Sequence, residues 1–296
     1  MKYAFNTWAF SHFPCWVPAY PIEEVIKRLA DIGYDGIELG CAQPQAWPYF
    51  TDKEKRNSIS KLVKEHNIRI SSILPAPGGG SGGNIASANT AEREWTIQYW
   101  KDCMDMGLEI DDCKTLLCVC GWYIYGTKKR DAWNWAKDAI SEVAEHAAKS
   151  GVTLVLEPTA TDSNLVESCE DAINMMDDIA MDNVKLMFDT THALYRNEVP
   201  SDYVYLMNKD LKHVHMADYG RKAPGTAGCD FVEIMQALKD VEFDGYVTME
   251  NGFGANKWYG FYAWKGKKKT KDFTATYTVS GQYRPRVIVG RHSCSN

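Results

Sequence analysis

Apolar positions along the chain alternate between two spacings, one typical of buried strands and the other of amphipathic helices. Residues 21–33 place isoleucine, valine and leucine at helical spacing, with a proline at the start and a glycine at the end. The next segment, DGIELG at 35–40, is short and largely apolar, as a strand buried on both faces would be. The same reasoning predicts strands at 2–8, 35–40, 68–77, 115–122, 154–158, 185–192, 213–218 and 246–251, and helices at 21–33, 52–67, 91–110, 131–151, 169–179, 200–211 and 230–241.

This order of elements predicts a single (β/α)8 TIM barrel in the α/β class. Strands and helices that alternate with short loops are the sequence form of βαβ units and a parallel sheet. A barrel of this kind needs about 250 residues, and the chain has 296. Two smaller domains would need a linker, and no linker-like segment occurs before residue 255. We therefore assign residues 1–255 to one catalytic barrel domain and residues 256–296 to an atypical basic C-terminal extension.

The extension differs from the barrel in charge. Residues 257–296 carry nine Lys and Arg against one Asp, a balance of +8, so the total of −6 leaves −14 for the rest. The segments TATYTV and YRPRVIVG alternate as the two strands of a hairpin would. A basic segment beside an acidic body favours docking of a second subunit near the tail, and we expect a homo-oligomer. A solvated basic tail and a segment that does not fold are the alternatives.

Composition limits the classes of function. A chain that is 45% hydrophobic and 24% charged is typical of a soluble globular protein. It has no run of about 20 apolar residues and no signal-peptide pattern, so we expect a cytoplasmic protein that does not engage a membrane. Nine cysteines without regular spacing indicate reduced thiols. The acidic body argues against nucleic acid as a partner, because phosphate binding needs a basic surface.

Polar residues end four successive predicted strands in the second half of the chain. They are Glu157, Asp189, His215 and Glu250, with His192 shortly after Asp189. Each alone is more often a helix cap or a structural donor, but catalytic groups of a barrel cluster at these strand ends. Carboxylate oxygens with one imidazole suit Mn²⁺, Mg²⁺, Co²⁺ or Fe²⁺ better than a thiol-binding metal. The set therefore predicts a metalloenzyme.

The motifs around these residues resemble the xylose isomerase-like barrels, and within them the ketose 3-epimerases related to D-tagatose and D-psicose 3-epimerase. The matching motifs, in the family's order, are LEP at 156–158, FDTTH at 188–192, HVHMADYGR at 213–221 with PG at 224–225, and MEN at 249–251. The resemblance covers about residues 1–255.

The resemblance implies roles for individual residues. The implied ligands of a divalent metal, for which we expect Mn²⁺, are Glu157, Asp189, His215 and Glu250. His192 and Arg221 would bind the substrate's hydroxyl and carbonyl oxygens. Glu157 and Glu250 would be the acid and base on opposite faces of the sugar.

Two features near the predicted site bear on the substrate. Where the epimerases have a second Glu, six residues after the first, this chain has Ser163, and Asp162 one position earlier is the candidate to replace it. Aromatic residues are also frequent in the strand-end loops, and we expect Trp8 and Trp122 to contact a sugar or an aromatic glycoside.

The chemistry leaves several outcomes open. A proton α to a ketone is too weakly acidic for an unaided carboxylate, so a metal must stabilise the enediolate as it forms. Two carboxylates on opposite faces then permit epimerisation, one base with a hydroxyl-to-carbonyl shuttle permits isomerisation, and a β leaving group permits elimination. The last would resemble the barrel subunit of C-glycoside-cleaving enzymes, a lyase acting on 3-keto-glycosides. An apurinic endonuclease, which would need more histidines, and a non-catalytic sugar-binding barrel are further alternatives.

Overall fold

Eight parallel strands close into a barrel in the computed structural model, which describes residues 1–10, 19–43, 45–76, 83–251, 275–280 and 284–289. Each strand pairs with its neighbour in sequence, and β8 returns to pair with β1, with Ala4 opposite Thr248. The strands are β1 (Lys2–Asn6), β2 (Gly36–Cys41), β3 (Arg69–Pro75), β4 (Thr115–Val119), β5 (Thr153–Glu157), β6 (Val184–Asp189), β7 (Leu211–Met216) and β8 (Tyr246–Met249). The predicted (β/α)8 TIM barrel is confirmed.

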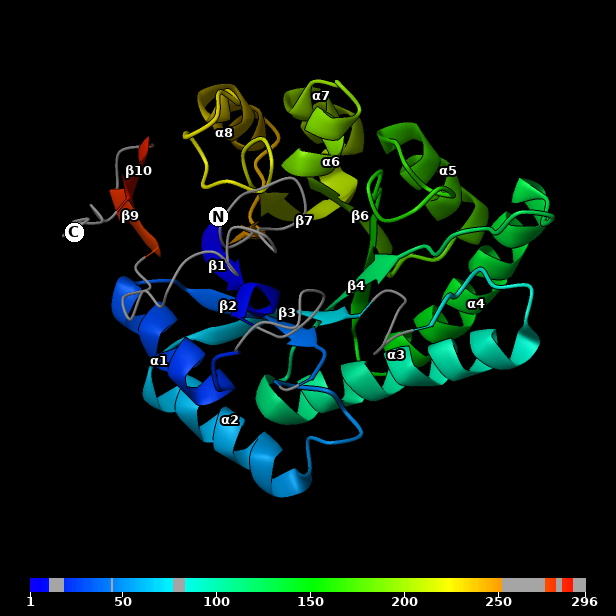
Figure 1. The fold of residues 1–296 in the computed structure, drawn as a ribbon, viewed down its shortest axis with the longest axis horizontal. Helices are drawn as coiled ribbons and strands as arrows, with labels where there is room; N and C mark the ends of the chain where they lie inside the picture. The colour runs from blue at the N-terminus through cyan, green and yellow to red at the C-terminus, as the bar shows by residue number, and fades with distance from the viewer. Residues whose placement is uncertain (11–18, 44, 77–82, 252–274, 281–283, 290–296) are drawn as a thin grey trace, which may run out of the picture.

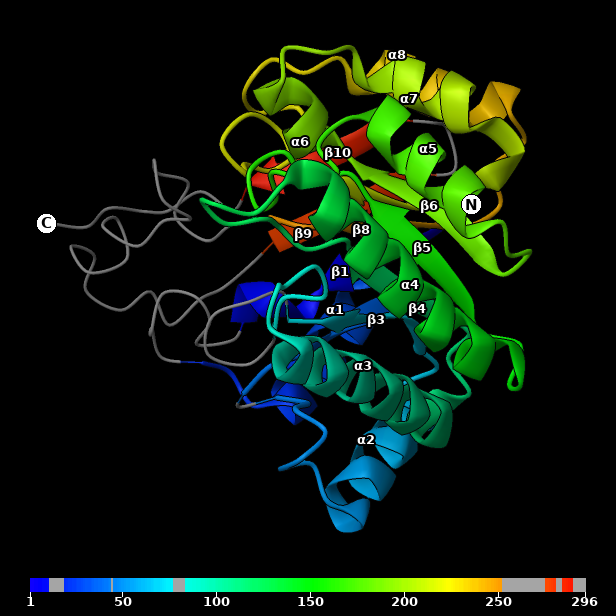
Figure 2. The ribbon, with the colours of Figure 1, turned by 90° about the vertical axis from the view of Figure 1, so that its right-hand side faces the viewer.

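The α-helices lie around the outside of this barrel, as Figures 1 and 2 show from two directions. They are α1 (Ile22–Ile32), α2 (Lys53–Glu65), α3 (Thr90–Asp111), α4 (Lys129–Ala148), α5 (Cys169–Ile179), α6 (Thr190–Tyr195), α7 (Pro200–Met207) and α8 (Phe231–Asp240). Side chains of Asp52, Ser168 and Asp230 accept backbone N–H groups at the starts of α2, α5 and α8. Capping of this kind satisfies donors that the helix itself leaves unpaired.

Strand residues alternate between the helices and the barrel interior. The outward set on β5, β6 and β7 includes Leu154, Phe188 and Val214, which belong to the main hydrophobic core. The inward set on β3 to β6 forms a separate cluster of Leu74, Leu117, Val119, Val155 and Met187. Glu157 follows Val155 by two residues on β5, and Asp189 follows Met187 by two residues on β6, so each lies on the same strand face as its apolar neighbour. The period of two therefore directs both carboxylates into the mouth of the barrel.

Among the predicted elements that differ in extent from those observed, three give way to an element of another type. The first strand ends at Asn6, and Thr7–Phe10 form a 3-10 helix that turns Trp8 across the barrel end. Residues 190–192, predicted as strand, begin the short helix α6 because the Asp189 side chain accepts the Thr191 N–H at 2.7 Å. The predicted helix 200–211 ends at Met207, and a 3-10 turn, Asn208–Asp210, follows.

Most of the predicted extension at 256–296 lies outside the described residues. Within it, β9 (Ala275–Ser280) and β10 (Arg284–Val289) pair antiparallel, as their alternating pattern predicts. Among the helices of the described residues, none is both long and apolar enough to cross a membrane.

The ring of Phe188 is fully buried on β6 and packs against Tyr203 of α7, with ring centroids 5.6 Å apart. Because a closed barrel cannot collapse around the space left by this ring, Phe188→Ala is expected to lower the free energy of unfolding by about 3–5 kcal/mol in urea titrations. Leu206→Ala is the matched control, since Leu206 on α7 is 64% exposed. Its expected change is within about 0.5 kcal/mol. Equal effects of the two substitutions would contradict this account of the core.

Candidate metal centre

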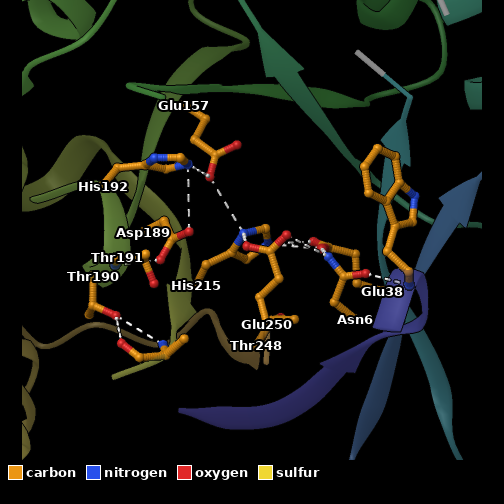
Figure 3. Close-up of polar contacts among 12 residues, drawn as sticks. Asn6, Glu38, Glu157, Asp189, Thr190, Thr191, His192, His215, Thr248 and Glu250 are labelled. Carbon is orange, nitrogen blue, oxygen red and sulfur yellow. Dashed lines mark hydrogen bonds and ion pairs between the residues drawn. The ribbon is translucent and has the colours of Figure 1, made fainter. Parts of the chain in front are cut away.

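The four predicted ligands meet at the C-terminal mouth of the barrel. Glu157 and Asp189 are the last residues of β5 and β6, His215 lies near the end of β7, and Glu250 directly follows β8. One ligand atom from each lies within 4.8 Å of those of the other three. Glu157, Asp189 and His215 are buried, and Glu250 is half-buried. Figure 3 shows these side chains pointing toward one another from separate strands.

The ring nitrogen Nδ1 of His215 lies at the centre of this group. It is 2.9 Å from Glu250 Oε2 and 3.5 Å from Glu157 Oε1. The backbone also fixes Glu250, because its N–H donates to the carbonyl of Met216 at 3.1 Å. Two glutamates from strands that are not neighbours therefore approach the same imidazole atom.

The donor set fits a divalent cation. Glu157 Oε1 and His215 Nδ1 are buried and neither makes a hydrogen bond of acceptable geometry. A buried polar atom without such a bond costs about 1–3 kcal/mol, and a cation that accepts both lone pairs would remove that cost. Carboxylate oxygens and one imidazole are hard to intermediate ligands, the type that Mn²⁺, Mg²⁺, Co²⁺ and Fe²⁺ bind.

Burial and crowding of charge shift the ionisation of these groups in opposite directions. Burial raises the pKa of Glu157 to about 8, and the nearby Glu250 and Asp189 carboxylates add to this increase. Burial acts in the same direction on Glu250, but Arg221 and His215 lower its pKa overall. His215 has a pKa well above its usual value, because Glu38 and Glu250 outweigh the effect of its burial.

Arg221 lies between two of the carboxylates. Its Nη1 contacts Asp189 Oδ2 and Glu250 Oε2, and the residue is 8% exposed. Its backbone has φ +60°, in the left-handed region that few residues with a Cβ adopt. The buried Asp218 carboxylate accepts the N–H groups of Ala227 at 2.7 Å and Cys229 at 3.1 Å and so holds this loop closed. The loop thus holds Arg221 in a strained conformation beside the cluster, as is common at functional sites.

His192 of α6 faces the cluster from the other side. Its Nδ1 lies 3.4 Å from the backbone nitrogen and 3.1 Å from the hydroxyl of Thr161, and its Nε2 lies 3.4 Å from Arg221 Nη2. Nε2 lies 3.7 Å from Asp189 and 3.9 Å from Glu157. Burial lowers the pKa of His192 to about 3, so a neutral imidazole faces the mouth.

Asp162 and Ser163 take different positions. Asp162 Oδ2 lies 3.8 Å from His192 Nε2, so this predicted residue reaches the edge of the cluster. The hydroxyl of Ser163 instead donates to the carbonyl of Gly121 at 2.6 Å and accepts the N–H of Leu165 at 3.0 Å. Ser163 therefore fastens the β5 loop to the β4 loop and does not extend into the mouth.

The two predicted substrate-binding tryptophans, Trp8 and Trp122, lie in different surroundings. Trp8 packs against the apolar inward cluster of the barrel. Gly40 makes room for its indole, because a Cβ on Gly40 would lie 1.7 Å from Trp8 Cδ1. Trp122 is half-buried after β4, and its backbone is held by Asn84 through bonds of 2.7 and 3.1 Å. The described contacts do not join its ring to the cluster, so its predicted contact with substrate stays a prediction.

A second buried group, which sequence reasoning missed, lies directly beneath the predicted ligands. Glu38 of β2 contacts His213 and His215 of β7, and Asn6 and Ser72 donate to it from β1 and β3. Burial opposes ionisation, but His215 and His213 hold the pKa of Glu38 well below its usual value. The sequence does carry a signal for this group: Glu38 is a single carboxylate between two apolar residues, Ile37 and Leu39, in a strand that is buried on both faces.

The metal affinity of the protein is expected to rise with pH. Glu157, with a pKa of about 8, and His215, with a raised pKa, are protonated in the metal-free protein at neutral pH and must lose protons before they ligate. Calorimetric titration with Mn²⁺ should show affinity that increases from pH 6 to 8, with proton release into the buffer. The exposed-site variant Glu94→Gln should leave this profile unchanged. Constant affinity between pH 6 and 8 would contradict these shifts.

The contact between Gly40 and Trp8 can be tested with a double-mutant cycle. Gly40→Ala is expected to lower the free energy of unfolding by about 1–3 kcal/mol, because its Cβ overlaps the indole. In a Trp8→Ala background the same substitution should be nearly neutral, since the overlapping ring is gone. Additive effects in urea titrations would show that the strain lies elsewhere.

Comparison with known proteins identifies the family. The family model described as the xylose isomerase-like TIM barrel matches residues 26–258. Fructoselysine 3-epimerase of Escherichia coli O157:H7 is 25% identical over 244 residues, which are 80% of this chain and 88% of that protein. D-psicose 3-epimerase of Enterocloster bolteae is 24% identical over 245 residues, 79% and 77% of the two chains.

A solved structure agrees in fold. The D-psicose 3-epimerase from Clostridium cellulolyticum H10, crystallised with D-tagatose, matches 88% of each chain with a TM-score of 0.76 at 20% identity. The closed barrel, the order of its strands and the family model lead to one conclusion. This chain belongs to the xylose isomerase-like TIM barrel family.

Proposed function

We propose that the protein is a divalent-metal-dependent ketose 3-epimerase. The observation that carries the proposal is the approach of Glu157 and Glu250, from β5 and β8, to within 3.5 and 2.9 Å of the same His215 nitrogen. Two strands, β6 and β7, lie between β5 and β8 on one side of the barrel and four on the other, so a sugar between the two glutamates would meet one carboxylate on each side. The similarity to fructoselysine and D-psicose 3-epimerases supports the same chemistry.

The proposed reaction moves one proton from one face of a carbon to the other. One glutamate removes the proton from C3 of the ketose, and the electron pair of the C–H bond moves toward the C2 carbonyl oxygen. The opposite glutamate then delivers a proton to the other face of C3, and the carbonyl is restored with inverted configuration at that carbon. Either glutamate can begin, because the reverse reaction uses them in the opposite order.

The surrounding residues stabilise the charge that develops during this transfer. The divalent cation, when bound, offsets negative charge on the substrate oxygens. Arg221 presents N–H donors and the neutral His192 presents its imidazole from two sides of the same mouth. Buried donors that are already oriented lose little energy in reorganisation when charge appears. Asp162, at the edge of the cluster, would accept a hydrogen bond from a hydroxyl at the remote end of the sugar.

The second candidate is a lyase that acts on 3-keto-glycosides. The observation that favours it concerns Ser163, which stands where the epimerases have a second Glu: its hydroxyl donates to the Gly121 carbonyl, so this position offers the sugar no side-chain contact and only the neighbouring Asp162 is left for that role. Such an enzyme would remove an α proton with the same glutamates, but the electron pair would expel an aglycone from the adjacent carbon. The two candidates therefore share a first step and differ in the second: the epimerase returns a proton to the carbon, whereas the lyase expels the aglycone.

The test follows deuterium and leaving groups together. The protein is incubated with Mn²⁺ in D₂O with separate free ketoses and 3-keto-glucosides, the metal is chelated, and proton NMR spectra are recorded. Deuterium at C3 with accumulation of the epimer is the expected result. Release of an aglycone without exchange into free ketoses would support the lyase, and neither event in any substrate would refute both.

Variants assign the two glutamates in the same assay. Glu157→Gln and Glu250→Gln are each expected to lower the rate at least about 10²-fold, because an amide cannot transfer the proton. Glu94→Gln, on the exposed face of α3, is the matched control and should retain the wild-type rate. Exhaustive chelation should abolish turnover and added Mn²⁺ should restore it. Unchanged rates in either glutamine variant would remove that residue from the proposed role.

A further inference from the structure

Glu38 is a buried carboxylate that the proposed reaction does not use. It is 0% exposed and projects from β2 into the barrel, below the predicted ligands. Four donors surround its two oxygens: His215 Nε2 at 2.8 Å, His213 Nε2 at 2.9 Å, Asn6 Nδ2 at 2.8 Å and the Ser72 hydroxyl at 2.6 Å. A carboxylate is the only side chain of this size that accepts all of them without offering a proton of its own.

The contact with His215 determines which of its nitrogens faces the mouth. Its Nε2 lies 2.8 and 3.0 Å from the two oxygens of Glu38, so Nε2 carries a proton and donates it. The other nitrogen, Nδ1, is then the one that can release its proton and offer a lone pair to a cation, and it faces Glu157 and Glu250. A carboxylate behind a histidine fixes the tautomer and the orientation of a metal-binding ring in this way.

A second path leads from Glu38 to Glu250 through Asn6. The amide Nδ2 of Asn6 lies 2.8 Å from Glu38 Oε1 and 3.2 Å from Glu250 Oε1. The Oδ1 of the same side chain accepts the N–H of Trp8 at 2.7 Å, which fixes the amide in this orientation. With Oε1 held by Asn6, the second oxygen of Glu250 turns toward His215 and Arg221. Figure 3 shows Asn6 between the two glutamates.

We propose that Glu38 is the positioning residue of the metal centre, which sets His215 to bind through Nδ1 and, by way of Asn6, directs Glu250 into the mouth. The inference rests on the proposed function only in requiring a divalent cation at the four predicted ligands. Glu38 itself does not touch the cation or the substrate. Its effect is on the geometry of two residues that do.

The first test measures Mn²⁺ binding by calorimetry, without substrate. Glu38→Gln is expected to weaken binding about 10- to 100-fold, because the amide NH₂ faces donors and no longer orients the His215 ring. Ser72→Ala is the matched control, since it removes one hydrogen bond to Glu38 and leaves the contact with His215 intact. Its Mn²⁺ affinity should remain within about threefold of wild type. Equal affinities of Glu38→Gln and wild type would overturn the proposal.

The second test uses the wild-type protein and so does not depend on the folding of a variant. Nitrogen NMR of ¹⁵N-histidine-labelled protein, titrated to saturation with the diamagnetic ion Mg²⁺, should show the metal-induced shift on His215 Nδ1 and, in the Mg²⁺-bound protein, the remaining ring proton on Nε2. In the Mg²⁺-bound protein, a proton on Nδ1 or the metal-induced shift on Nε2 would overturn the proposal whatever the variants show.

The outcomes separate this inference from the proposed function. If wild type binds Mn²⁺, Glu38→Gln binds it weakly and no ketose is epimerised, the positioning role stands and the 3-epimerase proposal fails. If ketoses are epimerised but Glu38→Gln binds Mn²⁺ as wild type does, only the positioning role fails. If wild type binds neither Mn²⁺ nor Mg²⁺, both are refuted.

Discussion

The concentration of carboxylates inside a closed barrel is the constraint on which the rest of the structure depends. Glu38, Glu157, Asp189 and Glu250 lie in or beside the barrel interior, where burial disfavours charge. Arg221 and His215 offset part of this charge from within the same group. A divalent cation would offset the remainder, which makes the folding of this barrel and its capacity to bind metal two aspects of one electrostatic balance.

The barrel and the strand-end positions of the four predicted ligands could be predicted because each depends on local sequence. Pro21 and Gly33 mark the ends of α1, and the alternation of strand and helix patterns requires no knowledge of distant contacts. Glu157 and Asp189 each end an apolar strand, so parallel strands bring them to one edge. The first three residues of α6, 190–192, were predicted as strand because the start of this helix depends on one side-chain hydrogen bond, from the Thr191 N–H to Asp189.

Other parts of the site depend on contacts that no local pattern reveals. Glu38 on β2 and His215 on β7 are 177 positions apart in the sequence. Only closure of the barrel between β8 and β1 brings them together. The position of Trp8 depends on the missing side chain at Gly40, a property of the folded pair. The left-handed backbone of Arg221 likewise follows from the loop held by Asp218 and not from the residue's own preference.

The inward faces of the strands divide the barrel into two unlike halves. The half formed by β1, β2, β7 and β8 is polar, with Asn6, Glu38, His213, His215 and Thr248 inside it. Apart from Ser72, which donates to Glu38, the half formed by β3 to β6 is apolar below its rim, with Leu74, Leu117, Val119, Val155 and Met187. Trp8 lies against the apolar half. A sugar ring has one face rich in hydroxyls and another with more C–H bonds. In the mouth, the face with hydroxyls would lie toward the polar half and the face with C–H bonds toward the apolar half. The difference in solvation between the two halves would therefore orient the sugar before any single hydrogen bond forms.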